Sequence, residues 1–170
     1  MLHPSNCSPR AVKVAIVFLV LCGIAAGQSF PLPATIKKDV ASLRNAVNEA
    51  VGGSGWGYFQ NAKGAYLEGY GMVVVAEVAF DQPANPFNVQ RTPEEIRATS
   101  AQRRKEVQEK LTNVLKQKAG ALESVAPNES VAIIVNILNA NPAYVTDIPY
   151  QIIFSVKKQD AARVILKEYK

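Results

Sequence analysis

Two segments of the chain carry apolar residues at the spacing of an amphipathic helix. In the first, aliphatic side chains recur at intervals of three and four, at Ile36, Val40, Leu43, Val47 and Val51. This pattern predicts a helix that begins near Thr35 and ends at Gly52. The second segment begins with TPEE (92–95), which has a capping-box pattern and a proline at the first helical position. It predicts a helix that continues to about Lys118.

Three further segments have strand patterns. The region 56–80 is predicted to form a β-hairpin that turns at NAKG (61–64). The run 130–139 is apolar on both faces, as expected of a central strand, and 150–157 alternates like a strand with one buried face. Asp160 is placed to cap a last helix.

The order of these elements is helix, two strands, helix, two strands and helix. It predicts an α+β fold: one mainly antiparallel sheet of about four strands, with helices packed on one face. The order of the strands within the sheet does not follow from the pattern.

The first 27 residues have the composition of a secretory signal peptide. Arg10 and Lys13 precede an apolar run from Val14 to Ala26, and the small residues AAG (25–27) follow the pattern of a cleavage site. We therefore predict an exported protein, periplasmic or extracellular, that begins at Gln28. The domain organisation becomes a signal peptide at 1–27, a flexible arm at 28–34 and a single α+β domain at 35–170.

Two alternatives to cleavage are open. An uncleaved segment would anchor the chain, although its thirteen apolar residues are fewer than the roughly 20 that span a bilayer. Lipidation at Cys22 is the other route, but Leu21 is larger than the residue that normally precedes a lipidated cysteine. Cleavage fits the pattern best, and it leaves no stable membrane span.

Cleavage would also remove every histidine and cysteine. The chain has one histidine, His3, and two cysteines, Cys7 and Cys22. The mature domain would therefore lack Ser-His-Asp and Cys-His catalysis, disulfides, and zinc or haem bound through these residues. We expect no cofactor and no metal. The formal net charge falls from +5 to +3, without the dense basic footprint of a nucleic-acid binder.

Glycines stand at the head of the most strand-like run, AYLEGYGMVVVAEVAF (65–80). If 66–80 is one strand, Gly69 and Gly71 share a face, where a helix comes close or the strand bulges. The alternative is a ligand groove at Gly69 and Gly71, flanked by Glu68 and Tyr70. The dinucleotide fingerprint fails here, because no third glycine and no helix follow.

Glu68 and Glu77 are the carboxylates of this predicted strand. A pair of carboxylates could hydrolyse a glycoside, yet nine residues apart on one strand they point to opposite faces. A rim position for Glu68 and an edge or paired position for Glu77 is the simpler interpretation.

The densest basic cluster lies on the second helix, at Arg97, Arg103, Arg104 and Lys105. A solvated helix face explains it most simply, and a surface for an acidic partner is the alternative. Separately, NES (128–130) matches a glycosylation acceptor, a pattern that is common by chance.

Three short motifs carry a resemblance. YLEGYG (66–71) before an apolar strand, PNESV (127–131) at a strand entry and FSVK (154–157) near the C-terminus resemble uncharacterised exported bacterial proteins. The resemblance covers most of the predicted mature chain. That group has no established activity, so no functional residue follows from it.

Two functions are compatible with these patterns. We expect an exported, non-enzymatic binding or assembly module of a bacterial cell envelope, whose partner is an envelope protein or polymer. The alternative is a small exported hydrolase that uses carboxylates. Strand addition at a hairpin edge is a further mode of binding.

Overall fold

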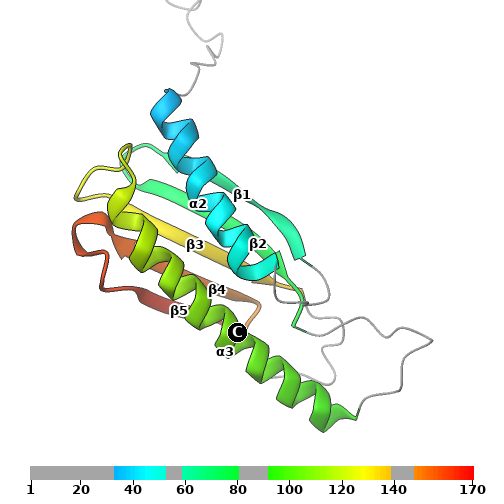
Figure 1. The fold of residues 1–170 in the computed structure, drawn as a ribbon. Coiled ribbons are helices and arrows are strands. Elements are labelled where there is room, and N and C mark those ends of the chain that lie inside the picture. The colour runs from blue at the N-terminus through cyan, green and yellow to red at the C-terminus, as the bar shows by residue number, and fades with distance from the viewer. Residues whose placement is uncertain (1–32, 53–58, 81–91, 139–147) are drawn as a thin grey trace, which may run out of the picture. The chain divides into compact units, whose positions relative to one another are not determined.

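The computed structural model describes residues 33–52, 59–80, 92–138 and 148–170 (Figure 1). The predicted signal peptide and residues 28–32 of the predicted arm (28–34) lie outside the described residues, whereas Ala34, the last residue of that arm, already belongs to α2. The elements are α2 (Ala34–Gly52), β1 (Phe59–Leu67), β2 (Gly71–Val78), α3 (Pro93–Lys118), β3 (Ser130–Ile137), β4 (Gln151–Lys157) and β5 (Ile165–Tyr169). Neither of the two helices has the combination of length and apolarity that a membrane span requires.

The five strands form one mixed sheet in the order β1-β2-β3-β4-β5. Neighbouring strands are antiparallel except β2 and β3, which are parallel. A parallel pair needs a crossover connection, and α3 lies in that connection between β2 and β3. The α+β class is confirmed, but the sheet has five strands rather than about four.

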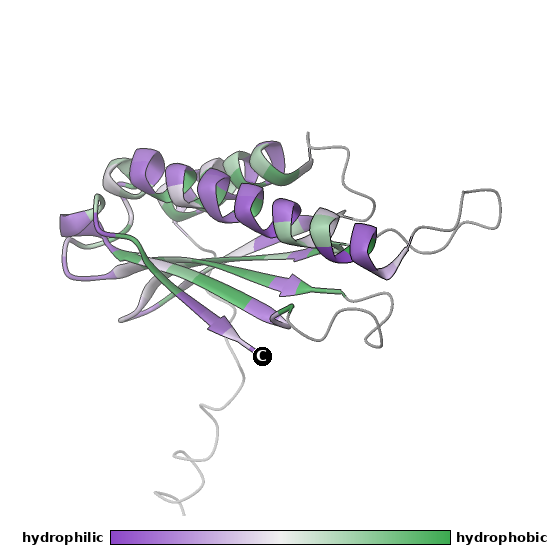
Figure 2. Cartoon of the chain, turned by 90° about the horizontal axis from the view of Figure 1, so that it is seen from below, coloured by the Kyte–Doolittle hydropathy of each residue, from purple (hydrophilic) through white to green (hydrophobic). Residues whose placement is uncertain are grey.

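Both helices cover the same face of the sheet (Figure 2). Most of the helix positions predicted to be apolar and inward-facing are buried in this layer: Leu43, Val47, Val51, Val107, Leu111 and Leu115. Ile36, Val40 and Val114 are half-buried. Alternate strand residues meet them from below, among them Met72, Val74, Ile133, Ile152 and Phe154. Full burial of such a side chain stabilises the fold by about 1.5–3 kcal/mol. The core therefore lies between one face of the sheet and two helices.

The capping box of α3 is confirmed. The Thr92 hydroxyl accepts a hydrogen bond from the Glu95 amide at 3.2 Å, and the Glu95 carboxylate accepts one from the Thr92 amide at 2.8 Å. These contacts satisfy two backbone N–H groups that a helix start leaves without partners. The helix ends at Lys118, as the apolar spacing predicts.

The predicted hairpin turn at 61–64 is wrong. β1 runs through this segment, and the chain turns at residues 68–70 instead. A register shift between Gln60 and Lys63 marks a bulge, and the Ala62 amide donates to the side chain of Asn48 in α2 at 2.8 Å. A Cβ on Gly64 would lie 2.8 Å from a methyl group of Val40. The glycine therefore lets α2 approach the strand rather than turning the chain.

The prediction of one strand over 66–80 is also wrong. Gly69 and Gly71 have φ angles of +77° and +118°; Gly69 lies in the tight turn between two strands, and Gly71 is the first residue of β2. A Cβ on Gly71 would lie 2.1 Å from the carbonyl oxygen of Ser130, whereas one on Gly69 would meet nothing within 4 Å. Gly71 thus permits a close approach of two backbone segments, and Gly69 permits a left-handed turn.

The predicted last helix is a third correction. Only a short 3-10 turn, Lys158–Asp160, follows β4, and the chain then returns as β5. β5 pairs with β4 along its length, from Ser155 opposite Ile165 to Gln151 opposite Tyr169. The backbone hydrogen bonds of this pairing outweigh the weak helical spacing of Ala161, Val164 and Ile165, which extends for little more than one helical turn.

Candidate functional site

A polar cluster joins the β1–β2 turn to the start of β3. The Tyr66 hydroxyl donates to the Glu129 carboxylate, with distances of 2.9 and 3.1 Å to its two oxygens. The Ala126 amide donates to the same carboxylate at 2.8 Å, and the Ser130 amide donates to the Tyr70 carbonyl at 2.7 Å. We call Tyr66 and Glu129, with the backbone that contacts them, the turn latch.

The electrostatics of the turn latch hold both side chains in their ordinary protonation states. The Ala126 amide, then the Tyr66 hydroxyl and then the Gly69 amide lower the pKa of Glu129, against the opposing effect of burial. The hydrogen bond to Glu129 raises the pKa of Tyr66, and burial and the nearby carboxylate charges add to the effect. At neutral pH the pair is a carboxylate acceptor and a phenol donor. Neither pKa lies near neutrality, where acid–base catalysis needs one.

The residues of the predicted ligand groove lie at this turn. Glu68, Gly69 and Tyr70 are its exposed residues, whereas Gly71 is buried at the first position of β2. The structure therefore brings the four residues together, but on a turn and not along one face of a strand. A ligand-binding role for them stays a prediction.

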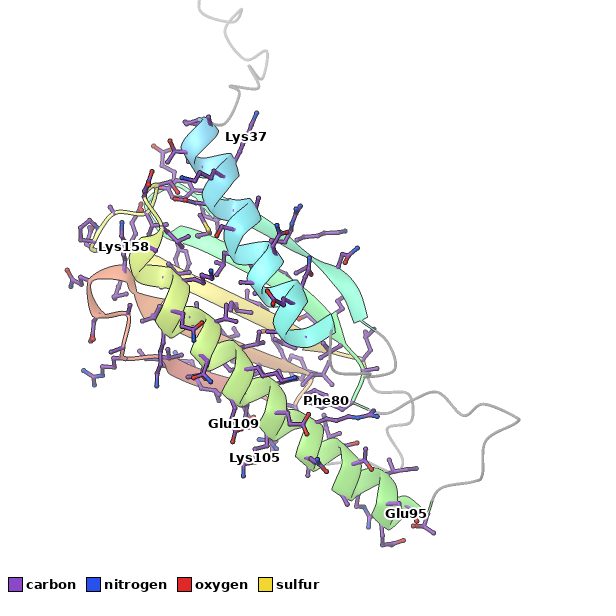
Figure 3. The ribbon with its side chains drawn as sticks, viewed as in Figure 1. Lys37, Phe80, Glu95, Lys105, Glu109 and Lys158 are labelled. Carbon is purple, nitrogen blue, oxygen red and sulfur yellow. The ribbon has the colours of Figure 1, made fainter. Side chains whose placement is uncertain are left out.

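The basic residues of α3 divide between structural and exposed positions. Arg103 donates to the carbonyl of Phe80 at 2.7 Å, and Arg104 forms a two-point ion pair with Glu168 of β5. Arg97 lies 3.6 Å from Glu94, and Lys105 is exposed (Figure 3). Two of the three guanidinium groups, those of Arg103 and Arg104, thus hold neighbouring segments. The role of this surface in binding an acidic partner stays a prediction.

A large apolar area lies on the other side of the sheet. No helix of the described ranges covers this side (Figure 2). The strand registers align its side chains in two rows across the sheet. The first row is Lys63, Val75, Ile134, Ile153 and Lys167, and the second is Ala65, Val73, Ala132, Ser155 and Ile165. We call these ten residues the open face.

The first row has three aliphatic residues between two lysines, whereas the second row has apolar residues at both ends, Ala65 and Ile165, and one polar residue, Ser155. Val73, Val75, Ile134 and Ile153 are half-buried, Ala132 is buried, and Ile165 at the β5 edge is 51% exposed. Polar residues close one end of the rows, where Gln151 donates to Asn136 at 2.9 Å. Glu77 stands beside Asn136 in that end row. The area has the character of an interface core with a polar rim.

Lysines mark the two lateral limits of the open face. Lys63 lies on β1 and Lys167 on β5, the two edge strands, and both are exposed. Neither ammonium group is in an ion pair with another side chain of the described ranges.

The carboxylates considered for hydrolysis do not meet. Glu68 is in the turn before β2, and Glu77 is near the opposite end of that strand. Glu77 is six positions after Gly71 along β2, which corresponds to about 20 Å. Among the described residues there is also no group of three acidic side chains that could hold a metal ion. The pair therefore lacks the common cleft that two-carboxylate hydrolysis requires.

A shallow depression on α3 is also a poor candidate for a binding site. It has a volume of about 340 Å³, opens widely to solvent and is lined by Gln108, Glu109, Thr112 and Asn113. Gln108 already donates to Glu168 at 2.7 Å. The depression is a surface feature of the helix and not a built pocket.

Sequence reasoning missed the turn latch and the open face. Glu129 lies in the glycosylation pattern and in the PNESV motif, but neither points to its contact with Tyr66, 63 residues earlier, which has no local signal. A signal for the open face was present, because 130–139 is apolar on both faces. That pattern was interpreted as burial on both sides, but in the described residues helices cover one side.

Comparison of the chain with known protein families, with curated proteins and with solved structures finds no match. The geometry and chemistry of the described residues are therefore the basis for a function.

Proposed function

We propose that the protein is an exported, non-enzymatic binding or assembly module of a bacterial cell envelope, and that it binds its partner through the open face. The observation that supports this proposal most directly is the contiguous row Val75, Ile134 and Ile153. It is aliphatic, and no layer from the described chain covers it. Contiguous apolar surface of this kind usually marks an interaction site, because its exposure to water is unfavourable.

The chemistry of the described residues supports binding over hydrolysis. The best-organised polar group, the turn latch, holds a low-pKa carboxylate and a high-pKa phenol, which favours a structural role. Glu68 and Glu77, the pair on which a hydrolase would depend, lie at opposite ends of β2. Export is supported by the signal-peptide pattern of 1–27.

Site-directed photocrosslinking in producing cells tests the proposal. A photoreactive amino acid at Lys63 or Ile165 of the open face should give one discrete adduct. The matched positions Lys37 on α2 and Lys116 on α3, both exposed on the helix layer, should not give this adduct.

Val75→Asp and Ile153→Asp provide the specificity control. Both side chains are half-buried on the open face, so a carboxylate there would disrupt binding while the core on the other side of the sheet stays intact. The adduct should disappear in these variants, and circular dichroism should show that they remain folded. An adduct that persists in folded variants, or that forms equally from the helix layer, would reject the open face as the binding surface.

A further inference from the structure

The charges on the open face indicate the chemical class of the partner that binds it. We propose that it binds an amphipathic helix of a partner protein, whose apolar stripe is flanked on both sides by Asp or Glu residues. This inference rests on the proposed function and adds to it the chemical class of the partner.

The width of the open face matches one helix. Lys63 and Lys167 lie in the same row with three strands between them. Four intervals of about 4.8 Å place their strands roughly 19 Å apart, and a helix with its side chains is about 10–12 Å in diameter. A helix that runs along β2–β4 would rest on the aliphatic centre. The two lysines would then stand on either side of it, within reach of carboxylates on its flanks.

The length of the strands limits the size of this helix. β2 and β3 have eight residues each and β4 has seven, which gives a surface about 25 Å long at roughly 3.3 Å per residue. A helix of about 16 residues covers that length. A surface of about 25 Å by 19 Å has an area of roughly 480 Å², smaller than the roughly 800 Å² that each partner contributes to a standard interface, so we expect a transient complex.

The charges argue against a second copy as the occupant. The strand registers place three lysines, Lys63, Lys157 and Lys167, on this side of the sheet. They place one carboxylate there, that of Glu77. Two such faces packed together would bring like charges into one interface, which costs binding energy. A partner with carboxylates beside an apolar stripe would instead complement the lysines.

The composition of the chain argues against its own segments as the occupant. The N-terminal stretch has no Asp or Glu before Asp39, and the other segments outside the described ranges contain two carboxylates, Asp81 and Asp147. None of these segments could place acidic residues on both flanks of an apolar stripe. The occupant therefore belongs to another protein.

Three synthetic peptides test the inference. Each is an 18-residue labelled helix with the same leucine stripe, flanked by Glu, by Gln or by Lys. Fluorescence anisotropy measures their binding to the protein as purified from producing cells. We expect the Glu-flanked peptide to bind about tenfold more tightly than the Lys-flanked peptide at low salt, and the difference to shrink as salt screens the lysines.

A double charge reversal supplies the critical comparison. Lys63→Glu with Lys167→Glu should invert the preference, so that the Lys-flanked peptide binds more tightly. The control pair, Lys37→Glu with Lys105→Glu, changes the same charge on the helix layer (Figure 3) and should retain the wild-type order. Because all four side chains are exposed, loss of folding is not expected to obscure the result.

Four results would overturn the inference. One is equal binding of the three peptides, and another is an unchanged preference in the Lys63→Glu/Lys167→Glu variant. A third is a dimer in sedimentation that Ile153→Asp dissociates, because the occupant would then be a second copy. The fourth is binding to phosphatidylglycerol vesicles that the reversal abolishes, without any preference among peptides, which would indicate a membrane surface.

The two proposals fail in different ways. If no peptide binds but the open face still gives its specific crosslink, the proposed function stands and the helical, acidic nature of the partner is wrong. If the crosslink is also absent, both proposals are wrong.

Discussion

At the scale of single residues, Gly69 and Gly71 stand two positions apart and differ in what constrains them. Both have positive φ angles, a conformation that disfavours side chains. Gly71 also lies against the Ser130 carbonyl, 2.1 Å from where its Cβ would be, whereas Gly69 has open space around that position. Conformation alone constrains Gly69, and the start of β3 constrains Gly71 as well.

Alanine substitutions separate these two constraints. Gly69→Ala should lower the free energy of unfolding by about 1–2 kcal/mol, the cost of a left-handed residue with a side chain. Gly71→Ala should cost about 3 kcal/mol or more, because β2 or β3 must also shift. Urea denaturation followed by circular dichroism measures both values. Equal losses would mean that the approach to Ser130 relaxes without cost.

Glu129 makes the stability dependent on pH. Its pKa is lowered in the folded protein from an ordinary value of 4.5, so its contribution is fully present above that value. The contribution is lost as the pH falls through the folded pKa. We therefore expect Glu129→Gln to unfold at lower urea concentration than wild type at pH 7, and the difference to shrink below pH 4.5.

Tyr66→Phe checks the cause of the Glu129 shift. It removes the hydroxyl donor but leaves the amides of Ala126 and Gly69, the other donors to the carboxylate. The pKa of Glu129, followed by NMR of its side-chain carboxyl carbon, should move toward 4.5 and stay below it. An unchanged pKa would show that the Tyr66 hydroxyl contributes nothing to the shift.

At the scale of elements, local signals sufficed for α2 and α3 but failed for the predicted last helix and at the ends of strands. The capping box and the apolar spacing determine α3 within its own sequence, and both are confirmed. The β1–β2 turn depends instead on a contact with Ser130, about 60 residues away. β5 likewise depends on pairing with β4, and the short segment after Asp160 carries no comparable signal of its own. Non-local contacts of this kind leave no periodic pattern in the chain.

The C-terminal strand is attached to the helix layer through Glu168. Its carboxylate accepts hydrogen bonds from Arg104 and Gln108 of α3, and the ion-paired side chains are 29% and 19% exposed. Glu168→Gln should weaken this attachment by about 1–2 kcal/mol. Amide hydrogen exchange in β5 should accelerate roughly tenfold, while β2 and β3 stay protected.

Lys167→Gln is the matched control for that experiment. Lys167 is on the same strand, exposed on the other side of the sheet and without an ion pair in the described ranges. Exchange in β5 should remain as in wild type. Comparable acceleration in both variants would show that loss of any charge, and not the bond to Arg104, loosens the strand.

At the scale of the whole molecule, the two helices and the sheet of the described residues leave one apolar surface without a covering layer. Both helices place their buried stripes on one side of the sheet, and the other side retains Val75, Ile134 and Ile153. The sequence indicated this surplus through the two-sided apolar pattern of 130–139. Which side would lack a helix depends on the crossover geometry. The surface that we propose for binding therefore could not be located before the fold was known.

The start of the chain supplies the last prediction. All histidine and cysteine residues lie at or before Cys22, and the buried core of the described residues uses neither type. Mass spectrometry of the protein from producing cells should find a chain that begins at Gln28, and dithiothreitol should not change its thermal unfolding. The full 170-residue chain in the membrane fraction would indicate an uncleaved anchor. A lipid-modified N-terminus at Cys22 would show that the chain is attached to a membrane. The open face would then bind its partner from that membrane.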